Sequence, residues 1–237
     1  MLSDDADENR RVKMSLAIRA ALASFILLIL AGAAGTAPPW QDSFTARLEA
    51  LALLESLNAD LLSHDSATLT LDRWCATHEL ASPARIIAER VHGVDKPPTA
   101  EQRRLLDVDA AEPIRYRRVK LTCGPHVLSE ADNWYVPARL TPAMNQVLDT
   151  TDTAFGRAVQ ALDFRRRTLS AVLLWSPLPP GWELGAPVPV EEGKPLAIPH
   201  GVLEHRAVLT LPDGTPFSTV VETYTGELLA FPQPPQR

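Results

Sequence analysis

Cysteine is scarce in this sequence of 237 residues, and basic residues do not outnumber acidic ones. Two cysteines and six scattered histidines are too few for a zinc framework or a disulfide-dense scaffold. Lysine and arginine together number 23 against 29 acidic residues, which gives a formal net charge of −6. The surplus of positive charge that phosphate contacts need is therefore missing. We expect neither a bound metal ion nor a nucleic-acid partner.

The sequence also lacks every self-sufficient catalytic motif that we sought. It has no phosphate-binding Walker loop, no GxSxG, no HExxH and no GxGxxG. Hydrophobic residues make up 46% of the chain and charged residues 22%, a balance typical of a folded globular protein. This length suits one domain with an N-terminal appendage, and two full enzymatic domains would not fit.

The N-terminal appendage has the pattern of an export signal or a membrane anchor. Residues 20–37 carry no charge and follow the basic residues Arg10, Arg11, Lys13 and Arg19, and small residues suited to cleavage surround Ala33. We expect residues 1–37 to be a signal peptide or an anchor, with membrane anchoring through residues 15–37. The folded domain at 40–237 would then be periplasmic or exported, or held outside the cytoplasm on the inner membrane. The alternative is a buried core helix, because such a stretch is short for a membrane span.

Export would place Cys75 and Cys123 in a compartment where a disulfide persists. Such a bond would add roughly 3–4 kcal/mol to the free energy of unfolding by the chain-entropy argument. Neither cysteine has a CxxC neighbour, so a redox or metal role has little support. Two independent buried thiols are the alternative.

Hydrophobic periodicity predicts an α+β fold. Helical spacing marks residues 43–62, a shorter stretch around 69–80, and short helices at 99–106, 142–148 and 153–159. Strand composition marks 84–91, 114–123, 127–136, 164–175, 203–211, 216–224 and 228–231. Because short turns join successive strands, we expect an antiparallel sheet of about six strands with helices packed on one side. Residues 176–199, with seven prolines, are expected to form a long surface loop.

Charged residues within the predicted strands are the first candidates for a site. Arg118 shares one strand face with Tyr116 and Lys120, and Glu222 lies between apolar residues of another strand. A buried arginine or glutamate is costly without a partner, and a carboxylated ligand could supply one to the arginine. A solvent-facing surface or an internal arginine–glutamate pair would explain the pattern equally well. Alternation also sends Arg165 and Arg167 to one face and Arg166 to the other, unless this run is only a solvated edge strand.

The central part of the chain resembles the chorismate pyruvate-lyase family and, more distantly, the effector-binding domain of GntR-type transcription regulators. The resemblance rests on the run from Arg118 to Cys123, on Pro137, on Thr153-Ala-Phe-Gly-Arg157 and on Arg167, which fall in register without a gap. Residues 61–68 look like that family's exit from its first helix. Gly214-Thr-Pro216 and Glu222 look like its last hairpin with its essential acid.

The resemblance implies a monomeric enzyme without a cofactor that converts chorismate to 4-hydroxybenzoate and pyruvate, a step of ubiquinone biosynthesis. It assigns Arg118 to a substrate carboxylate, Glu222 to proton transfer near the ring hydroxyl, and Arg167, Phe155 and Gly156 to substrate binding. Ala67 stands where that family tends to place a larger apolar residue that closes the pocket. We therefore expect a chorismate lyase-like enzyme acting on chorismate or a similar carboxylated ring. The alternatives are a non-catalytic module that binds a small aromatic acid, and a purely structural envelope protein.

Overall fold

A computed structural model describes residues 40–235 of the chain. These residues belong to one compact unit, Pro38–Arg237. The signal or anchor expected at residues 1–37 lies outside the described residues. Within residues 40–235, no helix is long and apolar enough to cross a membrane.

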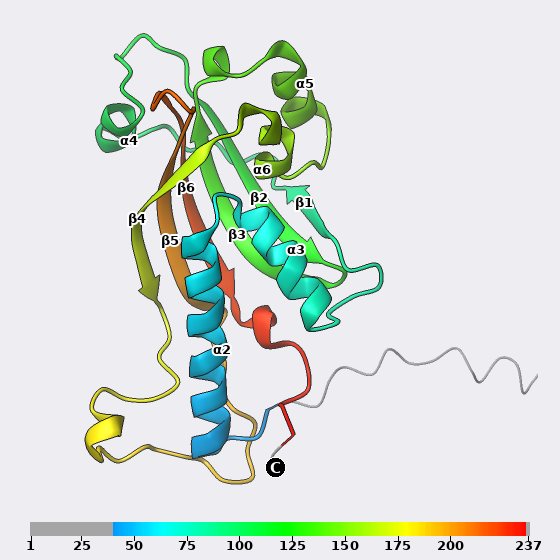
Figure 1. The fold of residues 1–237 in the computed structure, drawn as a ribbon, viewed down its shortest axis with the longest axis vertical. Coiled ribbons are helices and arrows are strands. Elements are labelled where there is room, and N and C mark those ends of the chain that lie inside the picture. The colour runs from blue at the N-terminus through cyan, green and yellow to red at the C-terminus, as the bar shows by residue number, and fades with distance from the viewer. Residues whose placement is uncertain (1–39, 236–237) are drawn as a thin grey trace, which may run out of the picture. The chain divides into compact units, whose positions relative to one another are not determined.

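A six-stranded antiparallel sheet forms the centre of the described unit, as the sequence predicts (Figure 1). The strands lie in the order β1-β2-β3-β6-β5-β4. Their bounds are β1 Ile86–Arg90, β2 Arg115–Cys123, β3 His126–Tyr135, β4 Arg165–Leu173, β5 Gly201–Thr210 and β6 Pro216–Thr225. Each half of the sheet therefore consists of three strands consecutive in sequence, and the halves meet where β3 pairs with β6.

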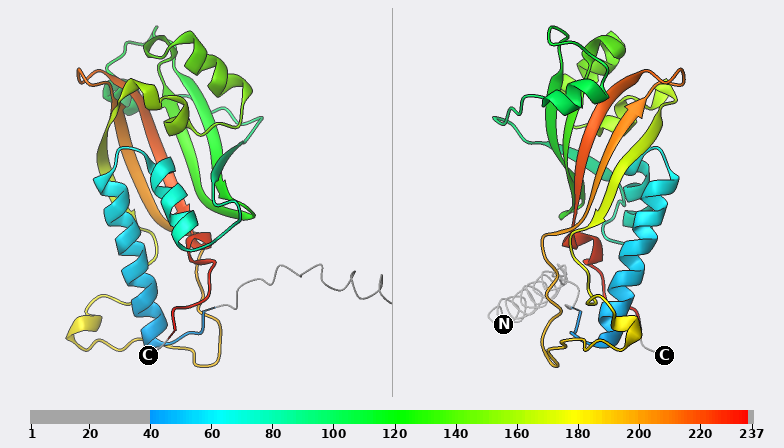
Figure 2. Two further views of the ribbon diagram at one scale, coloured as in Figure 1. Left: turned by 45° about the vertical axis from the view of Figure 1, so that its right-hand side comes forward. Right: turned by 90° about the vertical axis from the view of Figure 1, so that its left-hand side faces the viewer.

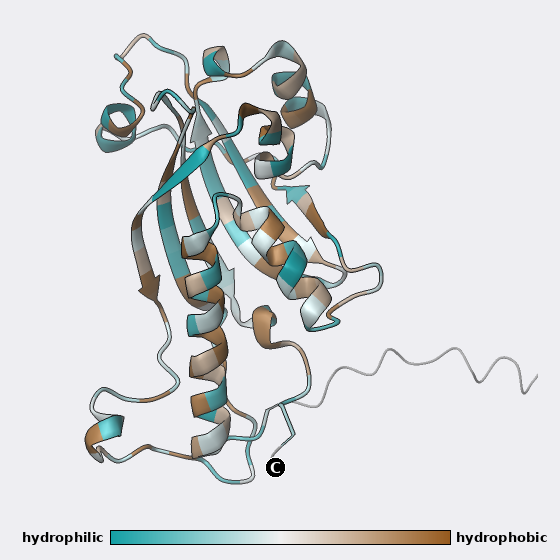
Figure 3. Ribbon diagram, in the orientation of Figure 1, coloured by the Kyte–Doolittle hydropathy of each residue, from teal (hydrophilic) through white to brown (hydrophobic). Residues whose placement is uncertain are grey.

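Two helices cover one face of the sheet, α2 (Phe44–Ser63) and α3 (Ala67–Thr77). Ser43 caps α2, and Ser66 caps α3 by accepting a hydrogen bond from a backbone N–H of the first turn. Hydrophobic and hydrophilic residues alternate along α2 (Figure 3), and Leu54 and Leu57 are fully buried against the sheet. The predicted helices at 43–62, 142–148 and 153–159 are confirmed as α2, α5 (Pro142–Thr150) and the short α6 (Phe155–Ala158).

The prediction that all helices lie on one side of the sheet is wrong for α4 (Ala100–Leu105). This helix lies over the opposite face, at one end of a groove that it forms with β2, β3, β5 and β6 (Figure 2). No residue of α4 is buried. Because α4 has no buried face, packing it against the main core would bury little apolar surface. It can therefore lie at the edge of the solvent-exposed face of the sheet.

The predicted strand at 228–231 is also wrong, because Gly226–Leu229 forms a 3₁₀ turn. Leu228 and Leu229 are both buried, whereas a strand with one core face would bury only alternate residues. The predicted loop at 176–199 contains only the 3₁₀ turn Trp182–Leu184 and returns to the start of the unit through a bridge between Gln41 and Pro195.

A disulfide joins Cys75 in α3 to Cys123 at the end of β2. The two Cα atoms are 6.1 Å apart, and neither cysteine is exposed to solvent. The structure therefore favours the disulfide over two independent thiols. It fixes α3 against the half of the sheet formed by β1, β2 and β3.

Candidate functional site

A small cavity lies between the helix-covered face of the sheet and the start of α3, with α6 on a third side. The space that the centre of a water molecule can occupy in it is about 40 Å³, so the cavity is large enough to hold water. Its apolar wall consists of Val119, Leu121, Ala131, Phe155, Phe164, Leu209 and Val220. Its polar and small residues are Asp65, Ser66, Ala67, Thr68, Arg117, Asn133, Gly156, Arg166 and Glu222.

Arg117 brings a positive charge to this cavity. The residue is only 4% exposed, and its guanidinium donates hydrogen bonds to the carbonyl oxygens of Thr153 at 3.0 Å and Thr151 at 3.3 Å. Its Nε is buried without a partner, and no carboxylate of the described residues forms an ion pair with it. Burial, with a smaller contribution from the nearby charge of Arg90, lowers the pKa of Arg117 to about 10. The side chain remains a cation at neutral pH.

Arg166 and Glu222 form a second, paired charge on the cavity wall. Arg166 Nη2 lies 2.6 Å from Glu222 Oε2, and the two side chains are only 4% and 7% exposed. The hydroxyl of Tyr224 donates to the same oxygen at 3.1 Å. Burial works to lower the pKa of Arg166, but the charge and hydrogen bond of Glu222, with contributions from Tyr224 and Asp65, outweigh it and the pKa is raised. Arg166 therefore remains a cation at neutral pH.

The edge strand β4 carries Arg166 into the cavity. The backbone N–H of Arg166 donates to Asp65 Oδ1 at 2.7 Å, which joins the start of β4 to the turn before α3. Like Arg117, Arg166 has a buried Nε without a partner. Both arginines that line the cavity thus keep one buried N–H without a hydrogen-bond partner among the described residues, which is costly in a folded protein.

Four of the predicted site residues line this cavity, and two do not. Glu222, Phe155, Gly156 and Ala67 are all part of its wall. Arg118 lies on the opposite face of the sheet, so the expectation that Arg118 and Glu222 face one enclosed space is wrong.

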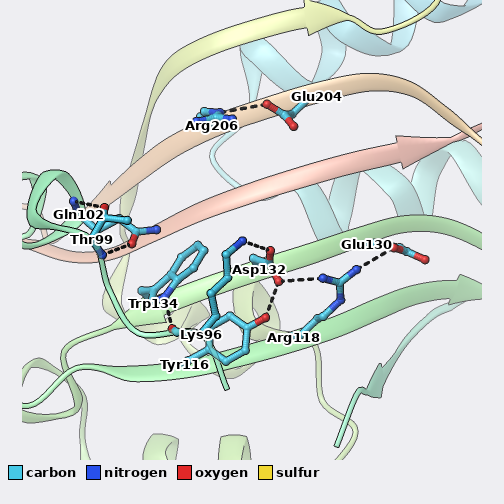
Figure 4. A network of polar contacts seen from close by, with 10 residues as sticks. All are labelled: Lys96, Thr99, Gln102, Tyr116, Arg118, Glu130, Asp132, Trp134, Glu204 and Arg206. Atoms are coloured by element: carbon cyan, nitrogen blue, oxygen red, sulfur yellow. Dashed lines mark hydrogen bonds and ion pairs between the residues drawn. The ribbon is translucent and has the colours of Figure 1, made fainter. Parts of the chain in front are cut away.

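Arg118 belongs to a network of ion pairs on the solvated face. Its guanidinium lies 3.1 Å from Glu130 and 3.5 Å from Asp132, which also binds Lys96 at 3.0 Å (Figure 4). The side chain therefore already has two carboxylate partners. Arg167 is likewise exposed, away from the cavity. Both arginines are displaced for the same physical reason, since successive side chains of a strand point to opposite faces.

The two arginines that line the cavity, Arg117 and Arg166, each directly precede a predicted site arginine in the sequence. Arg117 alternates with Val119, Leu121 and Cys123, all buried, and this apolar alternation is the sequence signal that places it on the core face. Arg166 is separated in the same way from its exposed neighbours Arg165 and Arg167. Glu222 points inward beyond a shift in the β5–β6 register at Leu209/Thr210, which lies between the turn and Glu222.

The cavity combines a largely apolar wall with four charged side chains. Arg166 pairs with Glu222, and Asp65 lies 3.6 Å from Arg165, so Arg117 is the lining cation that has no ion pair in the described part of the chain. A carboxylate could accept hydrogen bonds from the buried donors while its apolar body contacts the wall. The described residues contain no cluster of histidine, cysteine or acidic side chains that could hold a metal ion.

The described residues form an α+β domain with a cavity lined by a buried arginine and by an arginine–glutamate ion pair. The chain belongs to one family with the uncharacterized protein y4mC of Sinorhizobium fredii (strain NBRC 101917 / NGR234), with 59% identity over 196 residues that cover 82% of this chain and 83% of that protein. No family model matches the chain.

Solved structures of transcriptional regulators are also similar, at lower levels. PhnF from Mycobacterium smegmatis matches with a TM-score of 0.44 and 14% identity over 69% of this chain and 65% of PhnF. The effector domain of the same protein matches at 0.42, with 14% identity over 65% of this chain and 90% of the domain. YydK from Bacillus subtilis matches at 0.38, with 15% identity over 64% of this chain and 62% of YydK. Likeness at this level assigns no ligand or activity.

Proposed function

We propose that this domain binds a small carboxylic acid with an apolar body, without transforming it. The observation that carries the proposal is Arg117, a buried cation that has two backbone carbonyls but no carboxylate partner among the described residues. A buried charge is costly without a counter-charge, and a ligand carboxylate would supply it. The apolar wall formed by residues such as Phe155 and Val220 suits an aromatic or aliphatic body.

Glu222 narrows the proposed ligand to an acid that also carries a hydrogen-bond donor. Both hydrogen bonds to this carboxylate in the described part of the chain, from Arg166 and Tyr224, reach Oε2. Oε1 is therefore left to accept from a ligand hydroxyl. A hydroxylated aromatic acid such as 4-hydroxybenzoate combines the three features, namely a carboxylate, an apolar ring and a donor.

Replacing Arg117 with alanine is expected to weaken binding of 4-hydroxybenzoate at least about thirtyfold, because removing one partner of a buried charge pair costs about 2–5 kcal/mol. Isothermal titration calorimetry measures the affinity, and the ligand-induced rise in melting temperature gives an independent reading. Arg118→Ala is the matched control, since this neighbouring arginine lies on the solvated face and should bind as the unaltered protein does. Equal losses in both variants would contradict the assignment of Arg117.

A chorismate lyase-like activity is the second candidate, and the acid at the cavity favours it. Glu222 lies beside the space where the ring would sit, within reach of a general acid–base role. Purified protein incubated with chorismate distinguishes the two functions. Formation of 4-hydroxybenzoate that is lost in Glu222→Gln would establish the lyase, and binding without product would establish the binding module.

We also propose that the domain works outside the cytoplasm. The disulfide between Cys75 and Cys123 supports this location, because disulfides persist in oxidising compartments. The uncharged stretch at 20–37 would direct export, by cleavage near Ala33 or as an anchor in the inner membrane. Fractionation of expressing cells, with the mass of the mature species, tests the proposal. Full-length protein confined to the cytoplasm would overturn it.

A further inference from the structure

The cavity is closed to solvent almost everywhere, and its exposed positions identify a route inward. Among its lining residues, only Asp65, Ser66, Gly156 and Arg166 are not buried, and the Arg166 side chain itself is only 4% exposed. Access is therefore confined to one corner, where the turn before α3 approaches α6 and the start of β4.

The part of this corner between α3 and α6 is already filled by close packing. A Cβ atom added to Gly156 would lie 3.0 Å from Ser66 Oγ and 3.4 Å from Thr68 Oγ1. Even one added carbon would require Ser66 to shift by a few tenths of an ångström, so this seam is closely packed. The remaining side of the corner is the one bordered by Phe164.

A second hollow lies directly outside that side. This outer groove, of about 200 Å³, shares Asp65, Ser66 and Phe164 with the cavity, so the same three residues border both spaces. Its remaining residues are polar except Leu69; they include His64, Arg73, Gln160, Asp163 and Arg165. The exposed side chains of Arg165 and Asp163, at 65% and 81%, place the groove at the surface.

Phe164 stands between the two spaces. It is 7% exposed, and its ring packs edge-on against that of Phe217, with ring centroids 6.1 Å apart. The other two shared residues are tied to neighbouring backbone, Asp65 to the N–H of Arg166 and Ser66 to that of Leu69. The Phe164 side chain, by contrast, has no polar group, so its rotation breaks no hydrogen bond.

We propose that the outer groove is the entrance to the cavity and that the Phe164 ring is the gate a ligand must displace. This inference rests on the proposed binding function. It adds the residue that limits which acids enter the cavity. The space that a water centre can occupy in the cavity is only about 40 Å³, so an aromatic acid enters when the ring swings into the groove.

The disulfide makes a direct test of access possible. The chain has two cysteines and both are in the disulfide, so Ala131→Cys places a single reactive thiol on the cavity wall. Methyl methanethiosulfonate is small and uncharged, and mass spectrometry follows its addition. Adding Phe164→Ala to Ala131→Cys should raise the labelling rate about tenfold or more, because access then no longer waits for the ring to move.

Phe217→Ala is the matched control. Phe217 belongs to the same apolar cluster and is fully buried, but it does not line the cavity. Adding Phe217→Ala to Ala131→Cys should leave the labelling rate much closer to that of Ala131→Cys alone. The rates are compared at temperatures equally far below the melting temperature of each variant. Equal acceleration by both substitutions would overturn the gate, because loosening of the cluster would then explain the effect. No acceleration by Phe164→Ala would overturn it as well. If Ala131→Cys does not fold, Val220→Cys offers a thiol on the same wall.

Protection by ligand separates the gate from the proposed function. Saturating 4-hydroxybenzoate should slow labelling of Ala131→Cys, and it should slow labelling of the Phe164→Ala variant as well. If Phe164→Ala accelerates labelling but no aromatic acid slows it, the entrance is supported and the proposed ligand is rejected. Protection without acceleration would retain the ligand and reject Phe164 as the gate.

Discussion

Substitution of Arg166 by alanine is expected to lower the free energy of unfolding by about 3–5 kcal/mol, because it leaves the carboxylate of Glu222 buried without its counter-charge. The two side chains are 4% and 7% exposed and 2.6 Å apart, so water cannot replace the lost guanidinium without opening the cavity. Urea denaturation of the purified domain measures the effect. Arg167→Ala, on the exposed face of the same strand, should change the free energy by no more than about 0.5 kcal/mol.

The double variant Arg166→Ala/Glu222→Gln shows whether the unpaired charge is the cause. With no carboxylate left to bury, it should recover part of the stability that Arg166→Ala loses. A double variant less stable than Arg166→Ala would mean that packing of the arginine, rather than its charge, stabilises the fold.

Loss of the disulfide is expected to have a second large effect. Replacing Cys75 and Cys123 with alanine should lower the free energy of unfolding by about 2–5 kcal/mol, since the bond spans a sequence separation of 48 and restricts the unfolded chain. Urea denaturation of the double variant, compared with the unaltered protein with and without a reducing agent, measures it.

Agreement between the reduced protein and the double variant would attribute the loss to the bond rather than to the new side chains. An unaltered transition midpoint in the double variant would contradict a stabilising role. Because Cys75 belongs to α3, whose first residues line the cavity, the same variant should also bind 4-hydroxybenzoate less tightly.

The sheet could be predicted from sequence because its strands alternate clearly and are joined by short turns. In β2, Val119, Leu121 and Cys123 mark the core face, and that alternation also assigns Arg117 to the core and Arg118 to solvent. The family resemblance matched Arg118 and Arg167, whereas the alternation favours their neighbours. A shift of one residue is small in an alignment, but in a strand it moves a side chain to the other face of the sheet.

Other features depended on contacts that the sequence does not reveal. Nothing local indicates that Arg166 reaches Glu222, because β4 and β6 are separated by β5 in the sheet. The turn at Gly226–Leu229 has the composition of a strand, and only its burial on consecutive residues shows otherwise. Glu222, Phe155, Gly156 and Ala67 come from separate motifs of the resemblance, and the structure brings all four to the wall of one cavity.

The arrangement of the sheet as two three-stranded halves has a consequence for dissecting the molecule. Arg117 comes from the half formed by β1, β2 and β3, and Glu222 from the half formed by β4, β5 and β6, so the cavity exists only when β3 and β6 pair. A chain cut between α6 and β4 would yield two fragments, each with an unpaired strand edge that fits the other. Their reassembly in trans would rebuild the cavity, which makes the domain suitable for fragment-complementation reporters.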